Sequence, residues 1–185
     1  MKHLGKIALS LLAASTWWLA FIQQAEPEQK VSKPSHKVDY FLKDFDALSM
    51  TLTGTPKQRI ISEHMQHYID DDSTELIKPK MTMYSPGKPD LNIHSDTGYV
   101  SSDGELLLLN GVVHIKRSAL KNNAALEIDT HNLRVQLPND FAETDEFVTI
   151  KSGGNTIQGN GLRAHFREPI NIKILNNVDG HHEIK

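Results

Sequence analysis

The chain has 185 residues, room for one domain and an appendage, with 20 basic against 23 acidic residues and a formal net charge of −3. The balanced charge and the lack of a basic tract argue against a nucleic-acid-binding protein. There is no cysteine, so a disulfide framework, a thiol nucleophile and a cysteine-ligated zinc are excluded.

The N-terminal segment is apolar enough to be a membrane anchor. Residues 7–22 carry no charge, and as a helix these 16 residues cover about 24 Å of the roughly 30 Å hydrocarbon core. Starting the helix at Leu4 gives 19 residues, enough to span when the ends reach the interfaces. Two lysines precede the segment and two glutamates follow it, which predicts that residues 1–6 lie in the cytoplasm.

A cleavable signal peptide is the alternative, because it has the same basic start and apolar middle. Its cleavage site needs small residues three and one before the cut, and Ile22 and Gln23 interrupt that pattern. We therefore favour an uncleaved transmembrane anchor over residues 7–22. Residues 23–39 are polar, contain two prolines and show no apolar periodicity, which predicts an extended linker.

From Tyr40 onward the apolar residues alternate with polar ones, the period of a β-strand with one buried face. Leu133, Val135 and Leu137 show this pattern, and Gly-, Asp- and Ser-rich clusters separate the predicted strands. Residues 41–50 read as a lead-in strand, and the long strand near residues 106–115 has a break at Asn110-Gly111. No convincing amphipathic helix of ten residues follows residue 40, so residues 40–185 are predicted to form one all-β domain.

Two markers recur along this domain, which indicates an internal repeat. The first is an isoleucine followed, after one residue, by a small residue, at Ile60, Ile93, Ile128 and Ile157, in steps of 33, 35 and 29 residues. The second marker begins at Met81, Val113, Val148 and Val178, in steps of 32, 35 and 30 residues. Stacked repeats would fold two sheets over one another around a long interior with open ends. An ordinary β-sandwich without internal symmetry is the alternative.

The sequence predicts no catalytic centre, metal site or cofactor. His64 and His67 are three residues apart, which on a strand places them on opposite faces. Asp70–Asp72 lacks the ligand spacing of a calcium loop, and the glycines of residues 153–161 open no phosphate-binding helix. What remains is an interior with few aromatic residues. It is either simply a packed core or, in the sharper hypothesis, a site for acyl chains.

Several segments taken in order resemble the LptC family, the single-span inner-membrane component of the lipopolysaccharide export machine of Gram-negative bacteria. The segments, which follow the short anchor and the polar linker, are Asp39–Leu42, Ile60–Tyr68, Glu75–Pro79, Leu109–Ile115 and Ile128–Thr130. The resemblance implies a twisted β-jellyroll, open at both ends, in the periplasm. It also implies that the chain receives lipopolysaccharide from the LptBFG transporter and passes it to LptA. ATP hydrolysis would belong to the transporter, so the chain would not be an enzyme.

The resemblance and the predicted interior faces together give two sets of candidate residues. Lipid-binding candidates are Phe45, Ile60, Leu76, Met81, Ile93, Leu107, Val113, Ile115, Ile128, Leu133, Val148, Ile150 and Ile172. Partner candidates are Gly54, for the periplasmic domains of LptF and LptG, and Gly153, Ile170, Ile174 and Val178, for LptA. His181-His182 stands where the family pattern leads us to expect an aromatic residue. The alternative function is a structural adaptor that joins the transporter to a periplasmic bridge without binding lipid.

Overall fold

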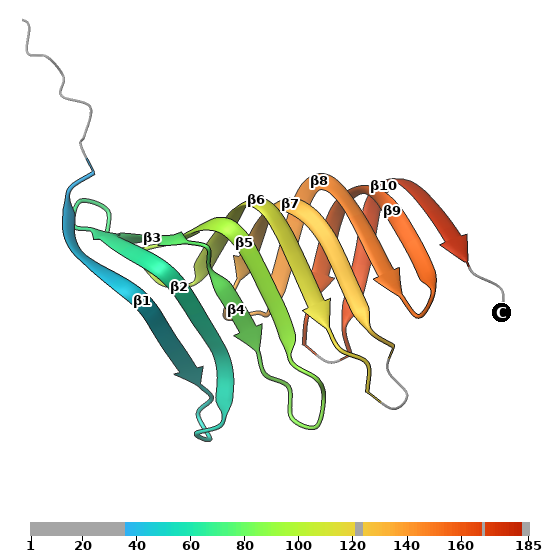
Figure 1. Cartoon of the computed structure of the whole chain (residues 1–185), viewed down its shortest axis with the longest axis horizontal. Helices are drawn as coiled ribbons and strands as arrows, with labels where there is room; N and C mark the ends of the chain where they lie inside the picture. Colours follow the sequence, from blue (N-terminus) through green and yellow to red (C-terminus); the bar gives the residue numbers. More distant parts are fainter. Residues whose placement is uncertain (1–35, 121–123, 168, 183–185) are drawn as a thin grey trace, which may run out of the picture. The chain divides into compact units, whose positions relative to one another are not determined.

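The computed structural model describes residues 36–120, 124–167 and 169–182, which form one antiparallel sheet (Figure 1). The ten strands are β1 (Val38–Met50), β2 (Pro56–Tyr68), β3 (Ser73–Ile77), β4 (Lys80–Met83), β5 (Leu91–Val100), β6 (Leu106–Arg117), β7 (Leu126–Gln136), β8 (Phe141–Ser152), β9 (Asn155–His165) and β10 (Asn171–His182). This part of the chain has no helix, which confirms the all-β prediction.

The predicted anchor, residues 7–22, lies outside the described residues, as does the linker up to residue 35. Within the part of the chain that the structure describes, no helix has the length and hydrophobicity to cross a bilayer.

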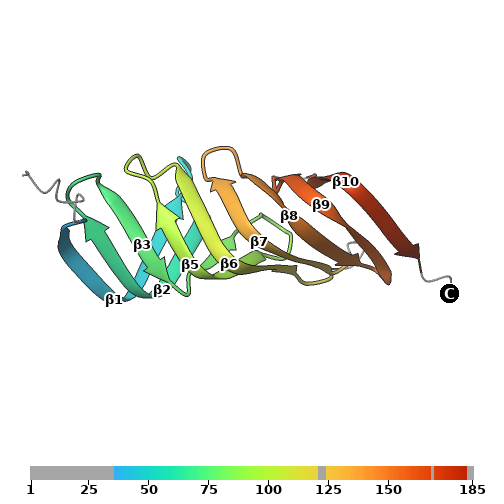
Figure 2. The same cartoon turned by 90° about the horizontal axis from the view of Figure 1, so that it is seen from above.

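Consecutive strands pair along almost the whole sheet, and one interruption divides a strand into two. β2 pairs with both β3 and β4, and both of these pair with β5. The break falls at Lys78-Pro79, where Lys78 has a positive φ of 48° and Pro79 has no N–H to donate to a ladder. Among the described residues, β1 and β10 are the edge strands, as their places at opposite ends of Figure 2 show.

The sheet is folded into two layers because each long strand bends at its middle, as the arching strands of Figure 1 show. The first layer contains β4 and the strand halves in line with it, and the second contains β3 and the other halves. At the bends the strand pairing shifts register. The shifts lie between Ser95 and Thr97 in β5, Leu109 and Val112 in β6, Asp129 and Arg134 in β7, Thr144 and Phe147 in β8, and Asn176 and Asp179 in β10.

The bend of β6 coincides with the predicted break at Asn110-Gly111. Gly111 has a φ of 80°, a conformation that glycine adopts without steric cost. Leu109 before the break and Val113 after it are both buried, so the interior face of the strand is kept through the bend.

Buried hydroxyl groups hold the backbone together at these bends. The residues are Ser62, Ser95, Thr130 and Thr144, all nearly inaccessible to solvent. The Ser62 hydroxyl donates to the Ile77 carbonyl at 2.8 Å and accepts from the Ile77 N–H at 3.1 Å. The Thr130 hydroxyl donates to the Phe147 carbonyl at 3.0 Å. These bonds satisfy backbone groups that a shifted register leaves without a ladder partner, which would otherwise be costly in a buried position.

The strand bends explain why the first sequence marker has a small residue after each isoleucine. Ser62, Ser95 and Thr130 are the small residues after Ile60, Ile93 and Ile128. The fourth copy has Gly159 instead, because a Cβ there would lie 2.5 Å from Ile174 Cγ2 and 2.8 Å from the Asn176 carbonyl oxygen. In each copy of the repeat, the small residue therefore lies where a strand bends.

Replacing Thr130 by valine tests whether its hydroxyl stabilises the bend, because valine keeps the side-chain shape and removes the hydroxyl. We expect Thr130→Val to lower the free energy of unfolding by about 1–3 kcal/mol, the cost of an unsatisfied buried carbonyl. The control is Thr149→Val on the outer face of β8, where we expect a change within about 0.5 kcal/mol. Denaturant unfolding of the full chain in detergent, followed by far-UV circular dichroism, measures both. Equal stability of the two variants would show that the Thr130 hydroxyl does not stabilise the fold.

Candidate functional site

The interior between the two layers is lined by apolar side chains that are direct cross-strand neighbours. In the first layer they form one unbroken row, which we call the first row: Ile60, Met81, Ile93, Ile115, Ile128, Ile150 and Ile157. The facing layer has a second row: Val100, Leu107, Val135, Ala142, Ala164 and Ile172. Six strand spacings of about 4.8 Å make the first row about 29 Å long.

Burial along these rows falls from the centre to the two ends. Ile93, Ile115 and Ile128 are at most 1% exposed. Ile60 at the β1 end is only partly buried, and Ile157 at the β10 end is 41% exposed. The interior is therefore a continuous apolar column that reaches solvent near both edge strands.

The lipid-binding candidates all lie on this interior. Ten belong to the buried core: Leu76, Met81, Ile93, Leu107, Val113, Ile115, Ile128, Leu133, Val148 and Ile150. Phe45, Ile60 and Ile172 are partly buried and pack against that core. The second row also contains Ala142 and Ala164, which are fully buried. Their alternation with polar residues is the only sequence signal for them, since alanine is weakly apolar.

The partner candidates divide between the two edges. Gly54 lies in the β1–β2 turn and has a φ of 78°. Gly153 lies in the β8–β9 turn, Ile170 directly precedes β10, and Ile174 lies within it. Val178 in β10 is 59% exposed. The predicted LptA-facing residues are thus on or next to the β9–β10 hairpin, at the opposite end of the sheet from Gly54.

The strand β1 presents apolar side chains to solvent over much of its length. The exposed ones are Val38, Tyr40, Phe41, Leu42, Leu48 and Met50. Charged pairs contribute to fixing β1 on β2: Arg59 Nε donates to Asp46 Oδ1 at 2.8 Å, and His67 Nδ1 lies 2.8 Å from Asp39 Oδ1. The hydrogen bond with Asp39 raises the pKa of His67, and the same bond lowers the pKa of Asp39.

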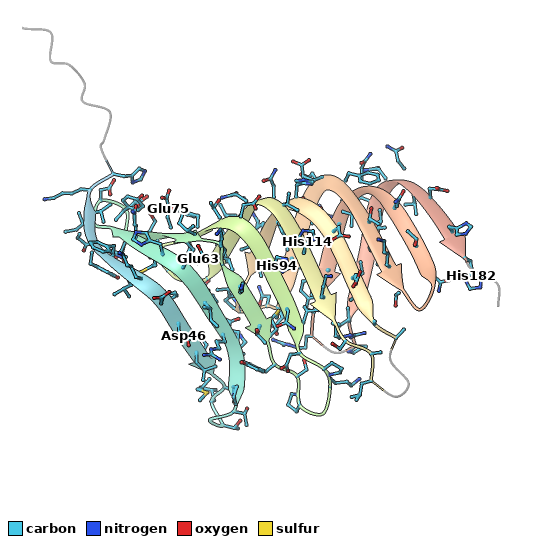
Figure 3. The ribbon with its side chains drawn as sticks, in the orientation of Figure 1. Asp46, Glu63, Glu75, His94, His114 and His182 are labelled. Atoms are coloured by element: carbon cyan, nitrogen blue, oxygen red, sulfur yellow. The ribbon has the colours of Figure 1, made fainter. Side chains whose placement is uncertain are left out.

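The outer faces of the layers carry many polar side chains, as the labelled residues of Figure 3 illustrate. His94 and His114 alternate with the buried Ile93 and Ile115, and their rings are 4.9 Å apart. Partial burial, followed by the nearby His114 and Lys116 charges, lowers the pKa of His94. His94 and His114 are thus polar residues on the outer face, directly beside apolar residues of the first row.

One cluster of possible metal ligands lies at the β1 end. His36, Asp70 and Asp71 place ligand atoms within 4.8 Å of one another, and all three residues are exposed. His36 Nδ1 lies 3.2 Å from Asp70 Oδ2. This arrangement is accounted for as a solvated ion pair beside the acidic β2–β3 turn.

The two layers also meet along a seam opposite the bends. Lys57 Nζ in the first layer donates to the Leu137 carbonyl in the second at 3.1 Å. Beside this contact is a cavity of about 350 Å³ that is lined by residues of both layers. The seam therefore has a direct contact and an open cavity side by side, whereas the bends are continuous backbone.

Comparisons with known proteins agree with this architecture. A family model described as "Lipopolysaccharide-assembly, LptC-related" matches residues 6–183. The lipopolysaccharide export system protein LptC of Escherichia coli (strain K12) is 26% identical over 144 residues, 76% of this chain and 72% of that protein. LptC of Shigella flexneri matches to the same extent.

A solved structure provides the fold comparison. It is LptH, described as the LptA-homologous periplasmic component of the lipopolysaccharide transport device of Pseudomonas aeruginosa. It aligns with a TM-score of 0.54 and 8% identity, covering 69% of this chain and 95% of that one. At this level of identity the similarity concerns the fold alone.

Proposed function

Because the chain belongs to the LptC-related family of lipopolysaccharide-assembly proteins, with a role in lipopolysaccharide transport, we propose that the interior of its folded sheet binds lipopolysaccharide acyl chains. The observation that carries the proposal is the unbroken first row, whose seven apolar side chains are cross-strand neighbours. Its length of about 29 Å exceeds one leaflet of a bilayer, about half of a 30 Å hydrocarbon core. A whole acyl chain would fit along it.

An apolar interior that is open at both ends suits the transfer of lipid between proteins better than the storage of lipid. Moving acyl chains between two apolar environments costs little, whereas exposing them to water costs about 0.8 kcal/mol for each methylene group. The two exposed ends of the rows, near Ile60 and Ile157, would let chains enter and leave without crossing water when another apolar interior is apposed. No catalytic step is part of this proposal.

Lipid entry requires the layers to move apart, since the central residues of the rows are packed against one another. The bends resist separation because each strand is continuous there and hydroxyls such as Ser62 and Thr130 bond the backbone. We take the seam to be the weaker side, because a cavity lies there beside the hydrogen bond from Lys57 to the Leu137 carbonyl. We infer that the layers hinge at the bends and open at the seam.

In the same proposal, each of the two edge strands binds a different partner protein. The exposed, apolar β1 would meet the periplasmic domains of LptBFG, with residues 7–22 anchored in the inner membrane and residues 23–37, up to the start of β1 at Val38, as the connecting linker. The edge strand β10 would pair with LptA in the periplasm, because an unpaired strand is a template for strand addition. His182 at the end of β10 contacts Asn155 of β9, so the departure at His181-His182 does not prevent pairing within this hairpin.

Photo-crosslinking tests the acyl-chain site. A photoreactive residue at Leu76 or Ile172, on the interior, should capture lipopolysaccharide in membranes that contain the whole transport machine. The matched controls are Ile77 and Lys173, the next residue in each strand, which alternation directs to the outer face. Capture at the interior positions alone is expected. No capture at Leu76 or Ile172, with both partners still bound, would favour the structural adaptor instead.

Separate changes at the two edges test the partner assignment. Deleting residues 171–185 should abolish co-purification of LptA and leave LptBFG bound, because it removes the edge strand β10. Conversely, Phe41→Asp should weaken LptBFG binding and leave LptA bound, since Phe41 is 59% exposed on β1. Retention of LptA by the shortened chain would contradict the assignment of β10, and unchanged LptBFG binding by Phe41→Asp would contradict that of β1.

A further inference from the structure

The β1 end of the second row differs from its apolar centre, because the line of cross-strand neighbours continues there into polar residues. The neighbour of Val100 in β3 is Thr74, and the neighbour of Thr74 in β2 is His67. Tyr40 of β1 is in turn the neighbour of His67. The His67 side chain is only 14% exposed. A titratable group therefore lies where the interior reaches the edge strand.

His67 places both ring nitrogens next to carboxylates from two other segments. Its Nδ1 lies 2.8 Å from Oδ1 of Asp39 in β1, and its Nε2 lies 3.0 Å from Oδ1 of Asp72 in the β2–β3 turn. A neutral imidazole has one N–H and can donate to only one of them, whereas an imidazolium donates to both. The complete bridge between β1 and the turn therefore exists only when His67 is protonated.

Two further contacts connect β1 to the same place. The ring of Tyr40 stacks on that of His67, with centroids 4.5 Å apart and planes at 11°, and a cation over the face of a tyrosine ring is attracted by it. The Ile69 N–H donates to the Lys37 carbonyl at 3.0 Å, so a backbone bond joins the two chain segments just beyond His67. The charge of one side chain thus affects several contacts of β1.

We propose that His67 is a protonation-dependent latch that holds the start of β1, residues 38–41, on the sheet. When His67 is neutral, one of the two carboxylates loses its donor and the Tyr40 ring no longer lies against a cation. The start of the edge strand is then held less firmly at the β1 end of the second row. The latch is a property of the folded chain and does not depend on lipid binding.

The direction of the pH effect follows from the contacts of His67. The hydrogen bond with Asp39 raises the pKa of His67, partial burial opposes this shift, and Asp72 adds to it. In the unfolded chain the ordinary value of about 6.5 applies. The latch is therefore complete below that ordinary pKa and is lost as the pH rises through the higher pKa of the folded state. Asp39 stays ionised, because the same bond lowers its pKa.

Other ionisable groups lie beside the latch. His36 Nδ1 is 3.2 Å from Asp70 Oδ2 and 3.9 Å from Asp71 Oδ2, both in the β2–β3 turn. From β3, Glu75 accepts a hydrogen bond from the Tyr68 hydroxyl at 2.7 Å. His36 offers a matched control, since it is a second histidine that contacts aspartates of the same turn.

Amide hydrogen exchange of the full chain in lipid-free detergent, measured by NMR, tests the latch between about pH 6 and about pH 9. Rates are expressed as protection factors, which remove the intrinsic pH dependence of exchange. We expect the protection of the Ile69 amide to fall by about tenfold at the higher pH, the effect of one charged hydrogen bond. Residues 46–49, which pair with β2 in the other half of β1, should show no comparable change.

Three variants assign the effect to His67. His67→Gln cannot be protonated, so the protection of Ile69 should be low and equal at both pH values. His36→Gln should keep the pH dependence of the unaltered chain. Asp39→Asn should lower the pKa of His67, followed by its ring resonances, and should lower the pH midpoint of Ile69 exchange by the same amount, because the carboxylate that raises this pKa is gone.

A pH-dependent loss of protection in His67→Gln as large as in the unaltered chain would overturn the latch. Abolition of the pH dependence by His36→Gln would assign it to the His36 pair and also overturn the role of His67. A lower pKa of His67 in Asp39→Asn without a lower exchange midpoint would show that the bridge does not hold β1. Because no lipid is present in these measurements, each outcome leaves the acyl-chain proposal to its own test.

Discussion

Every long strand of this sheet must bend at its middle, and the backbone groups left without ladder partners there must find others. The buried hydroxyls of Ser62, Ser95, Thr130 and Thr144 provide them, for example through the 3.0 Å bond from Thr130 to the Phe147 carbonyl. The rest of the structure depends on this arrangement. Without the bends there would be one flat sheet with an exposed apolar face, and the two rows would not face each other across an interior.

The two edge strands of the described sheet differ in the interactions that hold them on their neighbours. β1 is held on β2 partly by charged pairs such as Arg59 with Asp46, and its apolar side chains remain exposed. β10 is held by its pairing with β9, where Ile172 and Ile174 pack against the core and Val178 faces solvent. At both edges of the described sheet, therefore, apolar side chains remain exposed beside an edge strand, the kind of strand that can serve as a template for strand addition.

Much of this was accessible from the sequence because alternation and repetition are local signals. The period of two predicted the strands, and the isoleucines of the first marker, Ile60, Ile93, Ile128 and Ile157, proved to be four of the seven residues of the first row. The function of Ser62 and Thr130 was not predictable, since their partner carbonyls, those of Ile77 and Phe147, belong to neighbouring strands. The seam was not predictable for the same reason: Arg117 and Arg167 are 50 residues apart and meet one cavity only through folding.

Methyl NMR can show directly whether acyl chains lie between the two layers. Deuterated full-length protein with protonated isoleucine δ1-methyl groups would be studied in deuterated detergent with protonated lipopolysaccharide. We expect nuclear Overhauser contacts from acyl methylenes to Ile93, Ile115 and Ile128, and none to the outward-facing Ile61 and Ile77, which are 38% and 42% exposed. Contacts confined to Ile61 and Ile77, or no contacts with the interior methyls under saturating lipid, would contradict an acyl-chain site in the interior.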